Sequence, residues 1–115
     1  MLGSLYFEEF LRAYSYTVLI ELIVCYLMNR RFGYRVLWVV LVVNAFSLPF
    51  VWFVFPDLGL SYPVYLLVAE TFAVVSEALL MRKMFPMDAK RAFLTSFTMN
   101  MASFAFGILF PWLIL

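Results

Sequence analysis

Six polar residues inside otherwise apolar stretches form two sets with the same spacing. The second set repeats the first 56 residues further along the chain, and every member lies in a hydrophobic run: Glu21, Asn44 and Ser47, then Glu77, Asn100 and Ser103. Carboxylate and carboxamide groups are costly in hydrocarbon. Their recurrence at one spacing therefore indicates a buried polar site with internal two-fold character.

A third acid, Glu70, lies in the same run as Glu77, and these residue types together favour hard cations. Carboxyl, amide and hydroxyl oxygens suit a proton, Na⁺ or a hard divalent cation such as Mg²⁺, Ca²⁺ or Mn²⁺. Zinc fits poorly because the chain has no His and one Cys. No Lys, Arg or His lies at the level of these acids, and unpaired buried carboxylates are strongly disfavoured. We therefore expect the acids to be protonated or to bind a cation.

The composition places the elements that carry these residues in a membrane. The chain has 115 residues, of which 67% are hydrophobic and 13% charged, and its mean hydropathy is +1.01. A fully buried soluble helical protein is the alternative, but the chain lacks the polar residues to cover its surface. A net charge of +1 gives no reason to expect nucleic acid as a partner.

Apolar runs of about 20 residues predict four membrane-spanning helices in one domain over residues 1–115. The expected spans are 12–28, 36–55, 64–81 and 92–115, separated by breaks rich in Gly, Pro, Asn and Asp. The predicted fold class is an all-α integral membrane four-helix bundle.

The basic residues predict the orientation of this bundle. Seven of the eight flank the first and third loops: Arg30, Arg31, Arg35, Arg82, Lys83, Lys90 and Arg91. By the positive-inside rule the loops at 29–35 and 82–91 are cytoplasmic, and both termini lie outside a multi-pass cell-membrane protein.

Counting from these basic residues estimates how deep the polar residues lie. Glu21, Asn44 and Asn100 each stand nine residues from an arginine, which at helical rise corresponds to ~13 Å, close to the bilayer midplane. Glu70 and Glu77 bracket that depth at ~18 and ~8 Å. The two serines, twelve residues from their basic markers, match the level of Glu70. We expect all of them to converge between the helices.

Because a repeat of two spans preserves orientation, residues n and n+56 predict two parallel helical-hairpin repeats related by an axis along the membrane normal. Glu70 breaks this symmetry, since its counterpart is Tyr14. If the repeat holds, Glu70 is the specialised residue.

Three functional hypotheses follow. The first is a small transporter or channel that binds a proton or metal ion, and that forms a homodimer or larger oligomer if a solute other than an ion must pass. Its binding residues are Glu21, Glu70, Glu77, Asn44, Asn100, Ser47 and Ser103. The second is a structural or accessory subunit of a membrane complex, whose polar residues serve as interhelical glue. The third is an intramembrane enzyme, for which only metal-assisted chemistry stays open, because the chain has no nucleophile, zinc or phosphate-loop motif.

In length and four-span plan the chain resembles the small multidrug resistance transporters, whose first helix carries one essential glutamate for proton and drug exchange. The resemblance makes Glu21 the counterpart of that residue. The surrounding segment 16–22 lacks the family's motif, and the third and fourth spans carry polar residues that the family does not require. The resemblance therefore concerns architecture alone.

Overall fold

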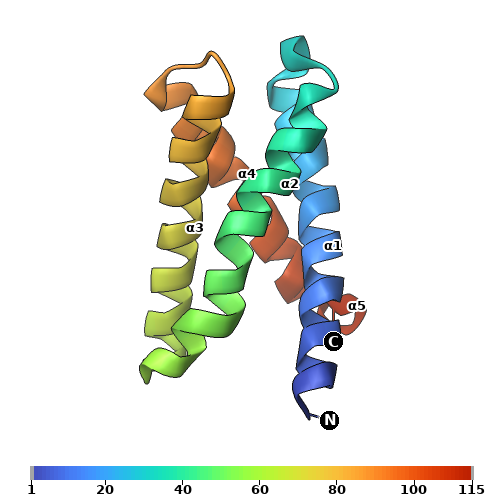
Figure 1. Ribbon diagram of the computed structural model, residues 1–115, viewed down its shortest axis with the longest axis vertical. Coiled ribbons are helices and arrows are strands. Elements are labelled where there is room, and N and C mark those ends of the chain that lie inside the picture. The colour runs from blue at the N-terminus through green and yellow to red at the C-terminus, as the bar shows by residue number, and fades with distance from the viewer. Residues whose placement is uncertain (1, 115) are drawn as a thin grey trace.

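The computed structural model describes residues 2–114 and shows an all-α four-helix bundle, as predicted (Figure 1). Each long helix packs against the next, and the fourth packs against the first, which closes the bundle. The long helices are α1 (Leu2–Met28), α2 (Arg35–Pro49), α3 (Tyr62–Met84) and α4 (Ala89–Leu109). The shorter elements are η1 (Arg30–Phe32), the π-helix η2 (Phe50–Val54), η3 (Phe55–Leu58) and α5 (Pro111–Ile114).

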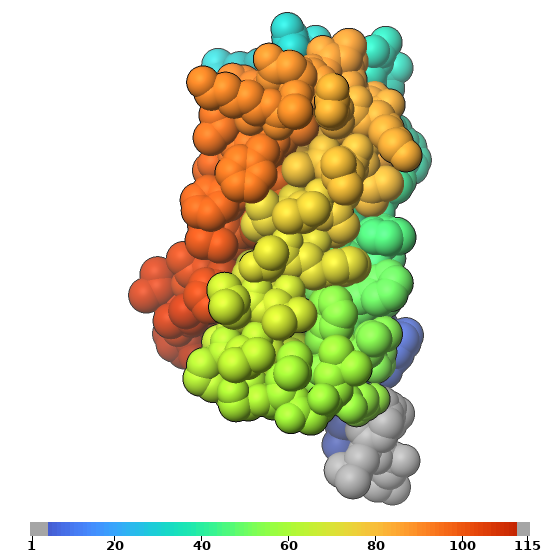
Figure 2. All heavy atoms as spheres, turned by 90° about the vertical axis from the view of Figure 1, so that its left-hand side faces the viewer, coloured from blue at the N-terminus to red at the C-terminus, as the bar shows by residue number. Residues whose placement is uncertain are grey.

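The dimensions and surface of the bundle match a membrane. Its long axis of 44 Å equals the thickness of a bilayer with its headgroups, about 40–45 Å. Four segments are long and apolar enough to span it: Leu5–Met28, Arg35–Leu58, Tyr62–Met84 and Ala89–Leu109. Many large apolar side chains are exposed, which suits lipid rather than water. Figure 2 shows one outward face, on which α3 (yellow) and α4 (orange) lie side by side. These features are those of a small multi-pass membrane protein.

Two helix bounds differ from the sequence expectation, each for a visible reason. α1 begins at Leu2 rather than near residue 12, because its first turns pack on the end of the second span. There the Phe10 ring lies 5.9 Å from Trp52 and 5.0 Å from Phe53, between ring centroids. α4 ends at Leu109 rather than running to residue 115, because the following Pro111 disfavours helical geometry at Phe110.

The second span continues beyond Pro49 by changing its helix type. Proline has no backbone N–H, and the segment after it widens into the π-helix η2. Two tyrosine hydroxyls from other helices donate hydrogen bonds to backbone carbonyls of this segment. Tyr65 Oη donates to Val51 O at 2.7 Å, and Tyr6 Oη donates to Trp52 O. The irregular turn is therefore tied to both α1 and α3.

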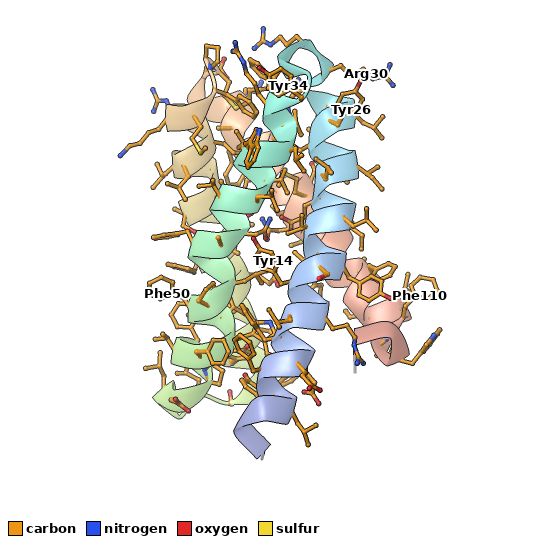
Figure 3. All side chains as sticks on the ribbon, turned by 45° about the vertical axis from the view of Figure 1, so that its right-hand side comes forward. Tyr14, Tyr26, Arg30, Tyr34, Phe50 and Phe110 are labelled. Carbon is orange, nitrogen blue, oxygen red and sulfur yellow. The ribbon has the colours of Figure 1, made fainter. Side chains whose placement is uncertain are left out.

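Both hairpin connections lie at one end of the bundle, and the α2–α3 connection lies at the other (Figure 1). Figure 3 shows Arg30 and Tyr34 at the hairpin end. Here the rings of Phe32 and Phe85 stack with their centroids 4.2 Å apart and tie the two connections together. Gly33 permits the first turn, since its φ of 58° and ψ of −134° disfavour any residue with a Cβ. Most of the buried apolar core fills this half of the bundle.

Candidate functional site

All four long helices contribute polar side chains to the middle of the bundle. Glu21 and Glu77, from α1 and α3, are 0% and 1% exposed. The amides and hydroxyls come from α2 and α4: Asn44, Ser47, Asn100 and Ser103. All of them are buried except Ser103, which is half-buried. The structure thus brings together six of the seven residues proposed from the sequence, through direct hydrogen bonds.

The carboxyl of Glu21 receives hydrogen bonds from two neighbouring helices. Asn44 Nδ2 donates to Glu21 Oε1 at 2.9 Å, and Ser103 Oγ donates to Glu21 Oε2 at 2.8 Å. One carboxyl therefore connects α1 with α2 and with α4. Both donors are uncharged.

The carboxyl of Glu77 has the same arrangement on the opposite side of the bundle. Asn100 Nδ2 donates to Glu77 Oε1 at 3.2 Å, and Ser47 Oγ donates to Glu77 Oε2 at 2.6 Å. This carboxyl connects α3 with α4 and with α2. Every bond in the set has a counterpart 56 residues along: each asparagine serves the acid of its own hairpin, and each serine serves the acid of the other.

The orientation of each amide is set by its own helix. Asn44 Nδ2 also donates to Val40 O at 3.0 Å, and Asn100 Nδ2 also donates to Ser96 O at 2.9 Å. These carbonyls lie four residues earlier and are again 56 residues apart. Because both bonds use the NH₂ group, each amide presents a donor to its carboxyl.

One buried polar atom of this site has no hydrogen-bond partner. It is Oδ1 of Asn44, a residue that is 1% exposed. An unpaired acceptor in such a place costs free energy of about 1–3 kcal/mol unless something donates to it. A bound proton donor or cation would satisfy it.

A cavity of about 170 Å³ adjoins the two carboxyls. Its lining is mixed, and its apolar members include Ala13, Val51 and Trp52. The polar lining consists of Thr17, Glu21, Asn44, Glu70, Glu77, Asn100 and Ser103.

Glu70 lines this cavity but stands apart from the hydrogen-bonded set. It is half-buried, and within residues 2–114 it has no hydrogen bond or ion pair. The two serines, expected at its level, bond the other two acids instead, because long glutamate side chains and the oblique course of α4 (Figure 1) bring different levels into contact. In the described part of the chain, no three His, Cys, Asp or Glu side chains are grouped closely enough to hold a metal ion.

A second polar cluster, in which Asn29 and Thr95 are buried and Arg91 is exposed, lies where the sequence predicts only the loop at 29–35. Asn29 Nδ2 donates to Thr95 Oγ1 at 3.3 Å and to Cys25 O at 3.1 Å, while Arg91 Nε donates to Asn29 Oδ1 at 3.2 Å. This cluster joins α1 to α4 at the hairpin end. The available signal was the i, i+4 pair of Arg91 and Thr95, which places both on one face of α4.

Comparison with known proteins adds no relative. No family model matches the chain, and no curated protein or solved structure matches it either.

Proposed function

We propose that this protein binds and releases a proton, or a small hard cation in its place, at Glu21 and Glu77, as a proton-coupled transporter or an ion channel. The observation that carries the proposal is the pair of buried carboxyls beside a polar cavity, with no cationic side chain to neutralise them. Seven of the eight Lys and Arg residues lie at the hairpin end, the eighth, Arg12, stands nine residues from Glu21 in α1, and the chain has no His. A bound proton or cation is then what neutralises the two buried carboxylates.

The oxygen donors also define which cations suit the site. Two carboxyls, the free Oδ1 of Asn44 and two serine hydroxyls are hard ligands. Two carboxyls suit a monovalent cation such as Na⁺, whereas a divalent cation is bound better by three. The third acid, Glu70, is not grouped closely with Glu21 and Glu77. Within this proposal the proton is the primary ligand.

The repeat and the orientation belong to the same proposal. The reciprocal hydrogen bonds support two parallel hairpin repeats around an axis along the membrane normal, with Glu21 and Glu77 as equivalent residues. The basic hairpin end faces the cytoplasm, and both termini face outward. In this orientation the cavity extends from the acids toward the outer side.

The small enclosed volume favours an oligomer if anything larger than an ion crosses. A cavity of about 170 Å³ lies below the ~300–1,000 Å³ typical of small-molecule pockets. A second copy of this chain, or a partner membrane subunit, would supply the additional wall.

One observation favours a second candidate function, interhelical glue in an accessory membrane subunit. The hydrogen bonds of Glu21 and Glu77 link α1 directly with α2 and α4, and α3 directly with α4 and α2. Such bonds stabilise helix association. The two candidates differ in what an amide does in place of an acid: glutamine can accept from the asparagine through Oε1 and donate to the serine hydroxyl through Nε2, but it takes up no proton at neutral pH.

The deciding experiment uses Glu77→Gln and Glu21→Gln in proteoliposomes that contain a trapped pH indicator. After a pH step, the native chain should move protons across the vesicle wall and each glutamine variant should not, although both keep native helicity. Glu8→Gln removes an exposed acid outside the site and serves as the matched control. Full proton movement by Glu77→Gln would reject the proposal and leave glue as the function.

A further inference from the structure

An apolar groove of about 460 Å³ lies between α1 and α2 at the hairpin end. Its lining differs from that of the central cavity and includes Leu22, Ile23, Tyr26, Leu27, Tyr34 and Leu37. All of these side chains are exposed except Leu22, which is half-buried. Because both helices are long and apolar enough to span a membrane, the groove opens toward lipid.

One arginine and two tyrosines stand at the hairpin end of this groove. Arg30 follows Tyr26 by four residues, and Figure 3 shows both at the hairpin end together with Tyr34. All three side chains are exposed. Over the part of the chain that the structure describes, the guanidinium of Arg30 and the two tyrosine hydroxyls make no hydrogen bond or ion pair. These donors are therefore available to a ligand.

The depth of the groove suits an acyl chain attached to a headgroup. Ile23 stands seven residues before Arg30, which at helical rise places it ~10 Å deeper in the bilayer. Tyrosine and arginine side chains at the end of a span lie at the membrane interface. The groove thus begins at the level of the headgroups and continues into the hydrocarbon.

The donors at the hairpin end of the groove suit an anion with several oxygens. A guanidinium group binds phosphate through two parallel N–H donors, and tyrosine hydroxyls can donate to the remaining oxygens. The apolar lining favours a ligand that also carries a hydrocarbon chain. A free phosphate would leave this lining uncovered, and an extended peptide would bring unpaired backbone groups into hydrocarbon. A phospholipid with a net negative charge satisfies both parts of the groove.

The charge at this end disfavours a second copy of the chain as the occupant. The loops at 29–35 and 82–91 hold seven basic residues and one acid, Asp88. That acid already caps α4, because its Oδ1 accepts from Arg91 N at 2.8 Å. A parallel copy would bring the same basic loops to the groove, and the juxtaposition of like charges is costly.

We infer that the α1–α2 groove binds one anionic glycerophospholipid, with its phosphate at Arg30 and one acyl chain along Ile23 and Leu27. The inference rests on membrane insertion and is independent of proton binding at Glu21 and Glu77. In the orientation proposed above, the lipid belongs to the cytoplasmic leaflet, where anionic lipids give the surface its negative potential.

The test measures lipid binding by native mass spectrometry. Delipidated protein in detergent is titrated with phosphatidylglycerol or with phosphatidylcholine that carries the same acyl chains. Both lipids have a phosphate, but the choline group of the second cancels its charge. The native chain should bind one phosphatidylglycerol about tenfold or more tightly than phosphatidylcholine, because hydrogen bonds between charged groups are the strong ones.

Variants separate the two parts of the site. Arg30→Gln should weaken phosphatidylglycerol binding about tenfold or more. Arg82→Gln makes the same change of charge on the other hairpin and should leave binding unchanged. Ile23→Trp fills the groove from an exposed position, keeps Arg30 and should weaken binding as well. Glycerol 3-phosphate in large excess should not displace the lipid, and circular dichroism checks that each variant keeps native helicity.

Equal affinity for the two lipids would overturn the inference. A loss in folded Arg30→Gln no larger than that in Arg82→Gln would overturn it too, by assigning the binding to the overall charge of the hairpin end. Unchanged binding in Ile23→Trp would show that the acyl chain does not occupy the groove, and displacement by glycerol 3-phosphate would leave only a site for small anions. A dimer that forms without lipid and is lost in Ile23→Trp would make a second copy the occupant.

Discussion

Removing one serine hydroxyl tests whether the interhelical bonds carry the stability that their geometry implies. In Ser47→Ala, Glu77 Oε2 loses the donor that now lies 2.6 Å away in a fully buried position. Leaving a buried acceptor unpaired costs about 1–3 kcal/mol, whereas interhelical bonds in membranes average ~0.6 and reach ~1.7 kcal/mol. Because this bond is short and completely buried, we expect a loss near ~1.5 kcal/mol, or about tenfold in the unfolding constant.

The symmetry-related variant has a smaller expected effect. Ser103 donates to Glu21 Oε2 at 2.8 Å but is half-buried, so Ser103→Ala should cost about 0.6 kcal/mol, the membrane average. Ser15→Ala is the matched control, because Ser15 is exposed and bonds only Leu11 O within its own helix. It should cost nothing measurable.

The assay is unfolding by sodium dodecyl sulfate in mixed micelles, followed by circular dichroism, with the free energy of unfolding compared among the three variants. A double-mutant cycle of Ser47→Ala with Glu77→Ala isolates the pair, because alanine removes both carboxyl oxygens and the coupling energy removes effects that each change has elsewhere. The reasoning fails if Ser47→Ala costs no more than Ser15→Ala, or if Ser103→Ala costs as much as Ser47→Ala.

Three further predictions concern other parts of the molecule. Phe85→Ala removes a buried ring from the stack on Phe32 and should lower the free energy of unfolding in mixed micelles by about 3 kcal/mol. Phe93→Ala removes an exposed ring and is the control; a loss in Phe85→Ala no larger than the loss in Phe93→Ala would contradict the prediction. Tyr65→Phe removes the hydrogen bond to the carbonyl of Val51. Loss of one hydrogen bond costs ~1 kcal/mol, so amide hydrogen exchange within the π-helix should accelerate about fivefold; unchanged exchange rates would show that this bond does not stabilise the π-helix. In intact cells, a membrane-impermeant maleimide should label Asp57→Cys but not Lys83→Cys, with the fully buried Cys25 silent in both; the reverse pattern would invert the proposed orientation.

The helices and half of the site could be predicted because both depend on spacing along the chain. Apolar runs of sufficient length identified the four spans, since a membrane allows few other structures. Counting from the basic residues placed Glu21 and Asn44 at one depth, and their side chains do meet at 2.9 Å. The same count placed Glu77 at ~8 Å and Asn100 at ~13 Å, yet their side chains also meet, at 3.2 Å.

The partners of the two serines could not be predicted from spacing. Ser47 was expected at the level of Glu70, yet it bonds Glu77. Which residues meet between hairpins depends on the rotation and crossing of helices, and these follow from packing of the whole bundle rather than from residue count. For the same reason Glu70, the acid without a repeat counterpart, was placed among the site residues although it lies outside their hydrogen bonds.

Direct hydrogen bonds at Glu21 and Glu77 are compatible with proton binding, because the two kinds of donor behave differently. An asparagine NH₂ group can only donate, so the Oε1 atoms that face Asn44 and Asn100 must stay unprotonated to keep those bonds. A serine hydroxyl both donates and accepts. When a proton binds Oε2, the new O–H can donate to Ser47 or Ser103 while the hydroxyl turns away. Each site can therefore accommodate the charged and the neutral acid without moving a helix, and under the proposed function the serine side of each carboxyl is the side that takes the proton.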